Sequence, residues 1–483
     1  MVTEIELKLD LTTEAAAFLE ASPLLEGAMA KAKLHARYFD TPQQDLAAHG
    51  LTLRIRRSGN KRTQTVKGEG APAAGLFDRS EWELPVSDDT PVMDDRTPVP
   101  ALLSDISAAL APAFDVKVER RTWIVAEGGS SIELVIDRGA AQAGTREAPI
   151  CEVELELKAG NTDALFAMAR KLDAVAPVRL GVLTKSERGY LLLRPAPASF
   201  KAEPVFLDTA LSAGQALRHI ALLCVRQFRL NEMLLSESRS SEALHQARVA
   251  VRRLRSALSI FKAVLPDPRL AHFRAEFKHL AGLLGEARDI DVMTANAPPG
   301  PLRHRLEAAR GAAYAHVEAA LASDRVRWLI LDFVEWVGSG ATTDPDREEA
   351  PEPAVAFAAA TLKRIRRKVK AHGADFKRLS DEERHDFRKL AKKLRYSAEF
   401  FGGLFPAKHR QRDYRKFVRA LEKLQDRLGL LNDQVAAHGI LDRLGLADDP
   451  DAAALIQHRK KAKLLAAAAT GYADLLEAPK FWA

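Results

Sequence analysis

The chain has 483 residues, more than one hydrophobic core usually supports, so its length predicts two or three domains. Hydrophobic residues make up 47% of it and cysteines number two, which favours a folded protein and excludes a disulfide framework. The net charge of +7 is uneven: residues 1–200 hold 24 Lys and Arg against 29 Asp and Glu, and the remainder holds 48 against 36. The second part is therefore the candidate polyanion binder.

Targeting signals are not expected in this sequence. The first ten residues, MVTEIELKLD, contain neither the basic segment nor the apolar core of a secretory signal. No run of about 18 apolar residues occurs, so a membrane span is not expected either. We therefore expect a soluble, cytoplasmic protein with no membrane partner.

Residues 1–195 consist of short segments in which apolar and other residues alternate, the pattern of half-buried β-strands. Helices are predicted at 12–21 and 161–175, each beginning at a plausible cap residue (Thr12 or Thr13; Asn161 or Thr162). Eight short strands with few helices are typical of an antiparallel barrel. The predicted strands are 3–9, 33–39, 51–57, 62–67, 79–86, 117–126, 131–137 and 150–158.

One face of these strands carries charge of both signs. In EIELKLD the charged Glu4, Glu6 and Lys8 alternate with apolar residues, and CEVELELK repeats this layout. A single strand usually turns such a face to bulk water, but here six strands share it, with cations and carboxylates on different strands. A closed barrel with this face inward would form a charged lumen, suited to a polyanion held through metal ions.

The stretch RPAPASFKAEP (194–204) predicts a domain boundary. We assign a first domain to 1–198 and a helical domain to 208–483. Within the helical domain, GSGATTDPDREEAPEPA (338–354) predicts a mobile loop. It separates two repeats, at about 210–337 and 355–480.

The helical repeat is visible in the sequence itself. LHQARVAVRRLRSALSIFKAVLP (244–266) matches RHDFRKLAKKLRYSAEFFGGLFP (384–406) at an offset of 140. Downstream, LLGEARDID (283–291) matches RLGLLNDQV (427–435) at an offset of 144. A duplicated helical hairpin, stacked with pseudo-twofold symmetry, accounts for both matches.

Each copy places four basic residues at i, i+3, i+7 and i+10, which is one narrow stripe of a helix. Neither stripe contains an acidic residue, although stacked like charges destabilise an isolated helix. Two such stripes would flank a groove that binds a phosphate chain or a nucleic acid. Few aromatic stacking platforms accompany them, which favours a polymer without bases. The stripes are His245, Arg248, Arg252 and Arg255, and His385, Arg388, Lys392 and Arg395.

Together these motifs resemble proteins that join a CYTH domain to a CHAD domain, of the bacterial inorganic triphosphatase type. The CYTH resemblance covers about 1–195 and the CHAD resemblance, carried by the duplicated HxxRxxxxxLR-type motif, covers about 210–480. The CYTH motifs are ExExK (4–8), RYFDTP (37–42), LTLRIRR (51–57), TVKG (65–68), RSEWELPV (79–86), VIDRG (135–139), ICEVELELK (150–158) and TKSERGY (184–190).

The resemblance implies an α+β multidomain protein, with an eight-stranded antiparallel triphosphate tunnel followed by an all-α duplicated helical bundle. It implies a cationic clamp on the phosphates: Lys8, Arg54, Arg56, Lys67, Arg120 and Lys185. Metal- and water-positioning carboxylates would be Glu4, Glu6, Asp137, Glu154 and Glu156. Glu81 and Glu83 would complete the catalytic wall together with Glu4, Glu6 and Lys8. Glu152 and Lys158 share the spacing but lie nearer a strand end and rank lower. For Lys117, Arg121, Glu133 and also Arg120, a register error of one residue would move the side chain outside the barrel.

The resulting interpretation is a Mg²⁺- or Mn²⁺-dependent hydrolase that cleaves inorganic tripolyphosphate to pyrophosphate and orthophosphate. Its helical domain would bind long-chain polyphosphate and place the enzyme in the cytoplasm or at polyphosphate granules. Carboxylates crowded in one lumen should raise each other's pKa until metal or Lys and Arg groups offset the repulsion.

Other functions stay open at this point. The chain could be a non-catalytic, granule-associated polyphosphate-binding protein. It could also be a tunnel enzyme acting on an organic triphosphate, by hydrolysis of thiamine triphosphate or cyclisation of ATP. A nucleic-acid scaffold is third. The sequence contains no GxxxxGK[ST] or HExxH motif, so P-loop and zincin chemistry are not supported.

Overall fold

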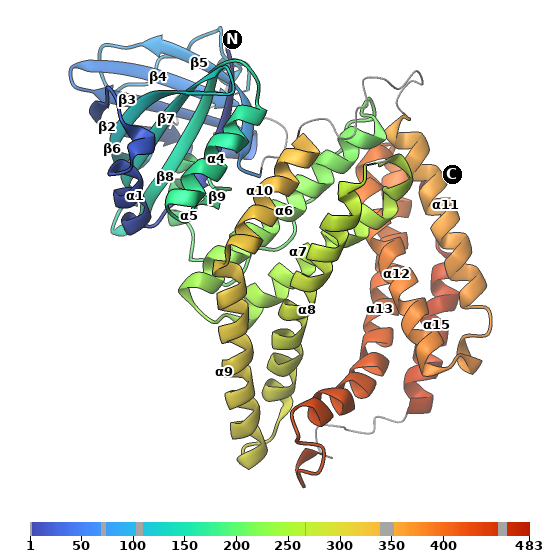
Figure 1. Ribbon diagram of the computed structural model, residues 1–483. Helices are drawn as coiled ribbons and strands as arrows, with labels where there is room; N and C mark the ends of the chain where they lie inside the picture. The colour runs from blue at the N-terminus through green and yellow to red at the C-terminus, as the bar shows by residue number, and fades with distance from the viewer. Residues whose placement is uncertain (1, 69–73, 103–109, 266, 339–351, 453–460) are drawn as a thin grey trace. The chain divides into compact units, whose positions relative to one another are not determined.

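The computed structural model describes residues 2–68, 74–102, 110–265, 267–338, 352–452 and 461–483. The chain divides into two units (Figure 1). One comprises Met1–Ala198 with Ala322–Ser339, and the other comprises Ser199–Leu321 with Gly340–Ala483. The predicted fold class is confirmed, since an antiparallel barrel is followed by helices. One stretch of the predicted helical domain, Ala322–Ser339, groups with the barrel instead.

The barrel contains all eight predicted strands, with β2, β5, β6 and β8 beginning earlier and β7 ending later than predicted. They are β1 (Val2–Asp10), β2 (Ala30–Asp40), β3 (Leu51–Ser58), β4 (Lys61–Gly68), β5 (Leu76–Pro85), β6 (Ala111–Glu127), β7 (Ser130–Ala143) and β8 (Arg146–Ala159). Their order is β5-β4-β3-β2-β6-β7-β8-β1, and β1 also pairs with β5, where Glu6 lies opposite Phe77. This last antiparallel pairing closes the barrel. A short β9 (Arg179–Leu180) pairs with β1.

Helices cover the apolar outer face of the closed barrel. Leu7 and Leu9 of β1 are buried, and α1 (Thr13–Glu20) and α4 (Asp163–Val175) pack over β1 and β8. Fully burying one leucine side chain stabilises the fold by about 1.5–3 kcal/mol. Of the two predicted cap residues, Thr12 caps α1 by accepting a hydrogen bond from Ala15 N at 3.1 Å.

Short helices cover the outer face of β3 and β4. Leu46 of α2 (Asp45–Ala48) and Val99 of α3 (Val99–Leu102) join a buried cluster with Leu53 and Ile55 of β3. A 3-10 turn, η1 (Pro23–Leu25), follows α1. Because these apolar residues alternate with Arg54 and Arg56, burying them outside directs the arginines into the lumen.

A helix that the sequence analysis did not assign fills one end of the lumen. This helix, α5 (Lys185–Leu192), packs against β6, β7 and β8. Its Tyr190 meets the ring of Phe114 edge-on at 5.0 Å between centroids, and Phe114 stacks on Tyr38 at 4.6 Å. Thr184 and Glu187 form a capping box at its beginning. The lumen is therefore apolar at this end and charged further along.

A helix from far along the chain packs on the barrel unit. This helix, α10 (Asp324–Gly338), contacts α4 and β9. Arg327 binds Asp173 of α4 at 2.7 Å, and the indole of Trp328 donates to the same carboxylate at 2.6 Å. Asp173 also accepts a hydrogen bond from Val178 N at 2.9 Å, so α10 completes the binding partners of a buried carboxylate.

The second unit consists of packed helices. They are α6 (Ala213–Glu237), α7 (Ser241–Ile260), α8 (Arg269–Asn296), α9 (Pro301–Ala322), α11 (Ala354–His372), α12 (Asp381–Phe401), α13 (Lys408–Arg443) and α15 (Lys461–Glu477). The two copies of the repeat contact each other through α7 with α12 and α6 with α11. Short 3-10 turns, η3 (Lys262–Val264) and η5 (Gly402–Leu404), occur at positions related by the offset of 140. A third, η4 (Phe376–Arg378), precedes α12.

None of the helices in the described part of the chain combines the length and the apolar composition needed to cross a membrane.

The plugged end of the barrel depends on a glycine. A Cβ at Gly189 would lie 2.1 Å from the ring of Phe114. We expect Gly189→Ala to destabilise the barrel by about 1–3 kcal/mol through overpacking. The same change at Gly311 of α9, where nothing lies within 4 Å, should be neutral or stabilising by up to about 1 kcal/mol. Calorimetric melting of both variants measures the difference, and equal shifts would contradict the plug.

Candidate functional site

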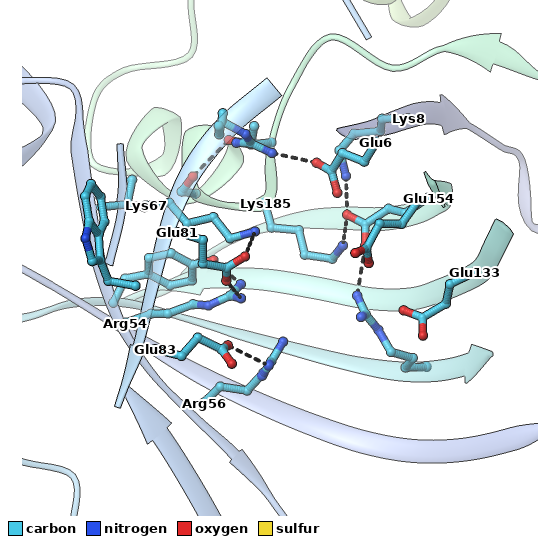
Figure 2. A pocket seen from close by; sticks show the side chains of 18 of the residues that line it. Glu6, Lys8, Arg54, Arg56, Lys67, Glu81, Glu83, Glu133, Glu154 and Lys185 are labelled. Carbon is cyan, nitrogen blue, oxygen red and sulfur yellow. Dashed lines mark hydrogen bonds and ion pairs between the residues drawn. The ribbon is translucent and has the colours of Figure 1, made fainter. Parts of the chain in front are cut away.

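The charged part of the lumen forms a cavity of about 860 Å³ (Figure 2). Eleven of the predicted site residues line it: Glu6, Lys8, Arg54, Arg56, Lys67, Glu81, Glu83, Arg120, Glu154, Glu156 and Lys185. Asp137 is fully buried behind this wall, and the Glu4 side chain lies outside the described residues. Arg120 lines the cavity, and so does Glu133, whose side of the barrel the sequence had left open.

Strand register sets the order of the charges along the lumen. Glu156 of β8 lies opposite Glu6 of β1 on one side and Glu133 of β7 on the other. One step deeper, Glu154 lies opposite Lys8. At the next step, Asp137 of β7 lies opposite Glu152 and Arg120. Cross-strand partners have Cβ atoms only about 4.5–5.5 Å apart, so each row places its charges in contact.

The deepest charges form a buried ion network around two ammonium groups. Lys8 Nζ contacts Glu152 Oε1 at 2.8 Å and also binds Glu154. Lys185 Nζ, at the beginning of α5, contacts Asp137, Glu152 and Glu154 at 2.7, 2.6 and 2.8 Å. Burying either charge alone would cost several kcal/mol, so the ions stabilise one another in place.

The guanidinium group of Arg120 joins the same network. Its Nη2 lies 2.6 Å from Asp137 and 2.9 Å from Glu154. Three carboxylates therefore share the three cations Lys8, Lys185 and Arg120.

The pKa values follow from this pairing. Burial alone would raise the pKa of Glu154, but the ammonium groups of Lys185 and Lys8 hold it well below its usual range. The pKa of Asp137 and that of Glu152 are lowered against burial in the same way. Burial would lower the pKa of Lys185, but the three carboxylates raise it well above its usual value. All these groups are charged at neutral pH, because the cations offset the expected carboxylate repulsion.

Strands β3, β4 and β5 carry a second set of pairs. Lys67 Nζ lies 3.1 Å from Glu81, and Arg56 lies 3.3 Å from Glu83. Arg54 contacts Glu81 at 4.0 Å. The neighbouring guanidinium of Arg54 is the main reason why the pKa of Arg56 is lowered. Figure 2 shows these side chains and the Lys185 side chain directed into the same cavity.

Sequence reasoning missed some members of the site. Arg79 lies 2.5 Å from Glu6 and rests over the ring of Phe77. Arg79 is two residues before Glu81 on the same strand and therefore faces the same side, which was a usable sequence signal. Glu152 was ranked low but is fully buried in the ion network. Arg96, which binds Asp94 at 2.7 Å, lines the cavity from a segment without periodic pattern, so no signal pointed to it.

The carboxylates could serve a divalent cation in two places. Asp137, Glu152 and Glu154 bring oxygens within 4.8 Å of one another, but Lys8, Lys185 and Arg120 already neutralise them. The outer row of Glu6, Glu133 and Glu156 faces the cavity and has fewer cations than carboxylates, since Arg79 pairs with Glu6 and Lys158 is shared by Glu156 and Glu133. Carboxylate oxygens are the donors that Mg²⁺ and Mn²⁺ prefer, so this row fits such an ion better.

In the second unit, the predicted basic stripes lie on α7 and α12 and meet in part, around Lys392, while Arg255 lies near Arg274 of α8. Arg252 of α7 donates to the hydroxyl of Tyr396 on α12 at 2.8 Å. Lys392 of α12 is surrounded by guanidinium groups from both helices. Two stripe residues are paired with carboxylates: Arg248 contacts Asp289 at 3.5 Å and Arg395 contacts Glu399 at 3.3 Å.

The crowding of positive charge lowers the pKa values of Lys392 and His245. Burial and the nearby Arg252 and Arg388 lower the pKa of Lys392 to about 7. Burial and the nearby Arg288 and Arg252 lower the pKa of His245 to about 4. Like charges held this close in the free protein favour an anion that neutralises them.

Family models match both parts of the chain. The CYTH domain model matches residues 3–190 and the CHAD domain model matches residues 219–442. An inorganic triphosphatase of Haemophilus influenzae is 34% identical over 203 residues, which cover 40% of this chain and 55% of that relative. The match thus spans about half the length of that relative.

Two further comparisons cover more of the chain. An uncharacterized protein of Mycobacterium tuberculosis is 30% identical over 459 residues, 83% of this chain and 82% of that protein. The crystal structure of a CHAD domain from the plant Ricinus communis matches with a TM-score of 0.50 and 28% identity, and covers 58% of this chain and 98% of that domain.

The buried network makes a prediction about stability. Glu152→Gln keeps the shape but leaves Lys8 and Lys185 short of one negative charge, so we expect a loss of about 3–5 kcal/mol at pH 7. Because the folded pKa of Glu152 is lowered, its contribution is complete above the ordinary carboxyl range and is lost as pH falls from that range through the lower folded pKa. The difference from the wild type should therefore shrink in acid.

Urea unfolding followed by circular dichroism, at neutral and acidic pH, measures this effect. Glu133→Gln is the control, because its partner Lys158 is 3.7 Å away and partly exposed. That variant should lose less than about 1 kcal/mol. Equal losses in the two variants would contradict the network.

Proposed function

Because this chain belongs to the family of proteins that pair a CYTH domain with a CHAD domain, we propose that its barrel cavity hydrolyses inorganic tripolyphosphate to pyrophosphate and orthophosphate. The single observation that carries the proposal is the convergence of cations from opposite walls on one cavity, each already bound to a carboxylate. These cations have already exchanged water for carboxylate oxygens. An entering polyanion can therefore replace the carboxylates without a further cost of removing water from the cations. The similar Haemophilus influenzae protein, an inorganic triphosphatase, supports the reaction class.

The cavity residues divide into groups with distinct proposed roles. Lys8, Lys185 and Arg120 hold phosphates from one wall, while the residues of β3 and β4 hold them from the other: Arg54, Arg56 and Lys67. Glu81 and Glu83 orient these β3 and β4 cations through the ion pairs described above. Phosphoryl transfer depends mainly on such charge neutralisation and positioning, and no covalent partner is needed.

A divalent cation, Mg²⁺ or Mn²⁺, is part of the proposal. Glu6 and Glu156 would hold it, with Glu133 as an added candidate, whereas the predicted ligand Glu154 is engaged by Lys8, Lys185 and Arg120. The predicted ligands Glu4 and Asp137 stand differently: Glu4 stays a prediction, and Asp137 is engaged by Arg120 and Lys185. When bound, the ion neutralises phosphate oxygens and lowers the pKa of a coordinated water.

The plugged lumen supports cleavage at a chain end. The apolar cluster around α5 occupies one end of the barrel, so a phosphate chain enters from the other end and its first phosphates reach Lys8 and Lys185. This arrangement suits a short linear substrate such as tripolyphosphate.

The groove between α7 and α12 is proposed to bind long-chain inorganic polyphosphate. It presents His245, Arg248, Arg252 and Arg255 on one side, with His385, Arg388, Lys392 and Arg395 on the other. A polyphosphate chain carries negative charge at regular intervals, and the two helices carry cations at regular intervals. The groove would localise the enzyme on its polymer, in the cytoplasm or at a granule.

Phosphate release tests the barrel. With tripolyphosphate, release should require Mg²⁺ or Mn²⁺ and stop with EDTA, and it should exceed release from ATP and thiamine triphosphate. Glu6→Gln should lower the rate more than about 100-fold, since even outer partners of a metal site are worth 10–100-fold. Glu26→Gln, at an exposed position, is the control. No release from any of the three substrates would overturn the enzymatic proposal.

A binding measurement combined with the hydrolysis assay separates the functions of the two units. Replacing Arg248, Arg252, Arg388 and Lys392 together by Gln should weaken polyphosphate binding more than about 100-fold, because each charged hydrogen bond contributes about 1.5–3 kcal/mol. Tripolyphosphate hydrolysis should stay at the wild-type rate. If both sets of changes abolish the same activity, the division of labour is wrong.

Lys392 makes polyphosphate binding pH-dependent. Its pKa is about 7, so near neutral pH Lys392 is only partly protonated in the free protein. Bound phosphates favour its ammonium form. Affinity should fall as pH rises from about 6 to about 8, with protons taken up on binding. Calorimetry in buffers of different ionisation enthalpy measures the uptake. Lys392→Arg should reduce it, Lys389→Arg should not, and unchanged uptake in Lys392→Arg would contradict the assignment.

A further inference from the structure

One short segment of backbone holds the two ammonium groups of the cavity, those of Lys8 and Lys185. Strand β9 pairs with β1 at Leu180 and Leu9, and the amide of the next residue, Gly181, donates to the carbonyl of Lys8 at 2.8 Å. A Cβ at Gly181 would lie 2.8 Å from Lys8 Cγ, so this backbone also packs against the Lys8 side chain. The same segment then leads into α5, which begins at Lys185. The position of β9 therefore sets the position of both cations.

A buried carboxylate fixes the backbone directly in front of β9. Asp173 of α4 accepts a hydrogen bond at 2.9 Å from the amide of Val178, and Arg179, the first residue of β9, follows at once. Asp173 is only 8% exposed, so its charge has to be balanced by other groups of the protein. The cation that balances it is Arg327, which belongs to α10 and not to the barrel strands or α4.

Two neighbouring residues of α10 donate to this carboxylate. Arg327 donates from Nε to Asp173 Oδ1 at 2.7 Å and from Nη2 to Oδ2 at 3.1 Å, which is the paired geometry that an arginine forms with a carboxylate. The indole of Trp328 donates to Oδ2 at 2.6 Å. Since Val178 donates to the same carboxylate, Asp173 joins α10 to the residue that precedes β9.

Further contacts hold α10 along the barrel unit. Arg170 of α4 lies 2.7 Å from Asp332 and also binds Glu335. At the other end of α10, a Cβ at Gly338 would lie 3.5 Å from Leu76, the first residue of β5. Helix α10 also contacts β9 directly. It is therefore held near its beginning, in its middle and at its end, and can act as a fixed support for β9.

We propose that Asp173, Arg327 and Trp328 are positioning residues for the phosphate-binding lysines of the barrel, and that they act through β9. The inference rests on the proposed function, in which Lys8 and Lys185 hold phosphates. A misplacement of about 1 Å at such a group can cost about 100-fold in rate. Helix α10 lies outside residues 3–190, which the CYTH domain model matches, and inside residues 219–442, which the CHAD domain model matches. The affinity of the barrel for its substrate thus depends on a helix from the CHAD part of the sequence.

Arg327→Gln in the full chain tests this role, because it removes the charge that balances Asp173. The KM for tripolyphosphate should rise about tenfold or more, as for other groups that orient a binding site. The kcat should change less, since the lysines hold phosphates both before and during the reaction. Arg327→Lys keeps the charge and should restore most of the affinity. A purely structural role would lower kcat together with the folded fraction and leave KM unchanged, and that result would overturn the inference.

A second variant, Trp328→Phe, guards against misfolding of Arg327→Gln. Trp328 is 44% exposed, so the change removes the indole donor and little packing. Its KM should rise as well, by a smaller factor. Lys171→Gln is the matched control, because it breaks an ion pair between the exposed Lys171 of α4 and Glu127 without touching α10. Exposed pairs contribute little, so its KM should equal that of the wild type.

Binding of tripolyphosphate without hydrolysis separates this inference from the proposed function. Isothermal titration in EDTA uses the full chain with the four groove cations replaced by Gln, as above, so that the barrel dominates the signal. Adding Arg327→Gln should weaken the Kd about tenfold or more at an unchanged number of sites. That shift would support the positioning role even if the wild type released no phosphate. If Arg327→Gln and Trp328→Phe both bind tripolyphosphate as tightly as their parent does, α10 does not position the lysines.

Discussion

Closure of the barrel by the β1–β5 pair is the constraint on which the rest of the molecule depends. Once the sheet is closed, the period-two alternation leaves each charged residue of the inner face no route to bulk water except the cavity. Buried ions of one sign are then too costly, so opposite charges on neighbouring strands must pair. The contacts of Lys8 and Lys185 with Glu152 and Glu154 are the result.

The same pairing would prepare the cavity for the anionic ligand proposed above. Cations that are already desolvated and oriented by carboxylates lose little freedom when phosphate oxygens replace or join those carboxylates. The helical unit solves a related problem differently, because the stripes on α7 and α12 gather like charges without full compensation. The repulsion between these like charges, together with burial, lowers the pKa of Lys392.

Much of the barrel could be predicted because one physical signal, alternation, determines both strand and face. Arg54, Glu81 and Glu154 were placed inside by that signal alone, while the role of Lys185 came from family resemblance. Helix α5 was missed, although the spacing of Thr184 and Glu187 is a capping signal. Its own sequence shows no clear apolar face, and its burial depends on a contact with the distant Phe114. Glu152 was underrated because the predicted strand began at residue 150, whereas β8 begins at Arg146 and places Glu152 in mid-strand, next to Lys185 of α5. The packing of α10 on α4 has no local signal at all.

That packing has a consequence for synthesis on the ribosome. Asp173 and Arg170 of α4 are made early, but their partners Arg327 and Asp332 lie about 150–160 residues further along the chain. At a translation rate of about 5–20 residues per second, the barrel waits roughly 8–32 s for α10. During that interval the Asp173 carboxylate and the Arg170 guanidinium of α4 are without these partners and face solvent. Completion of the barrel unit is thus timed by translation of the helical half.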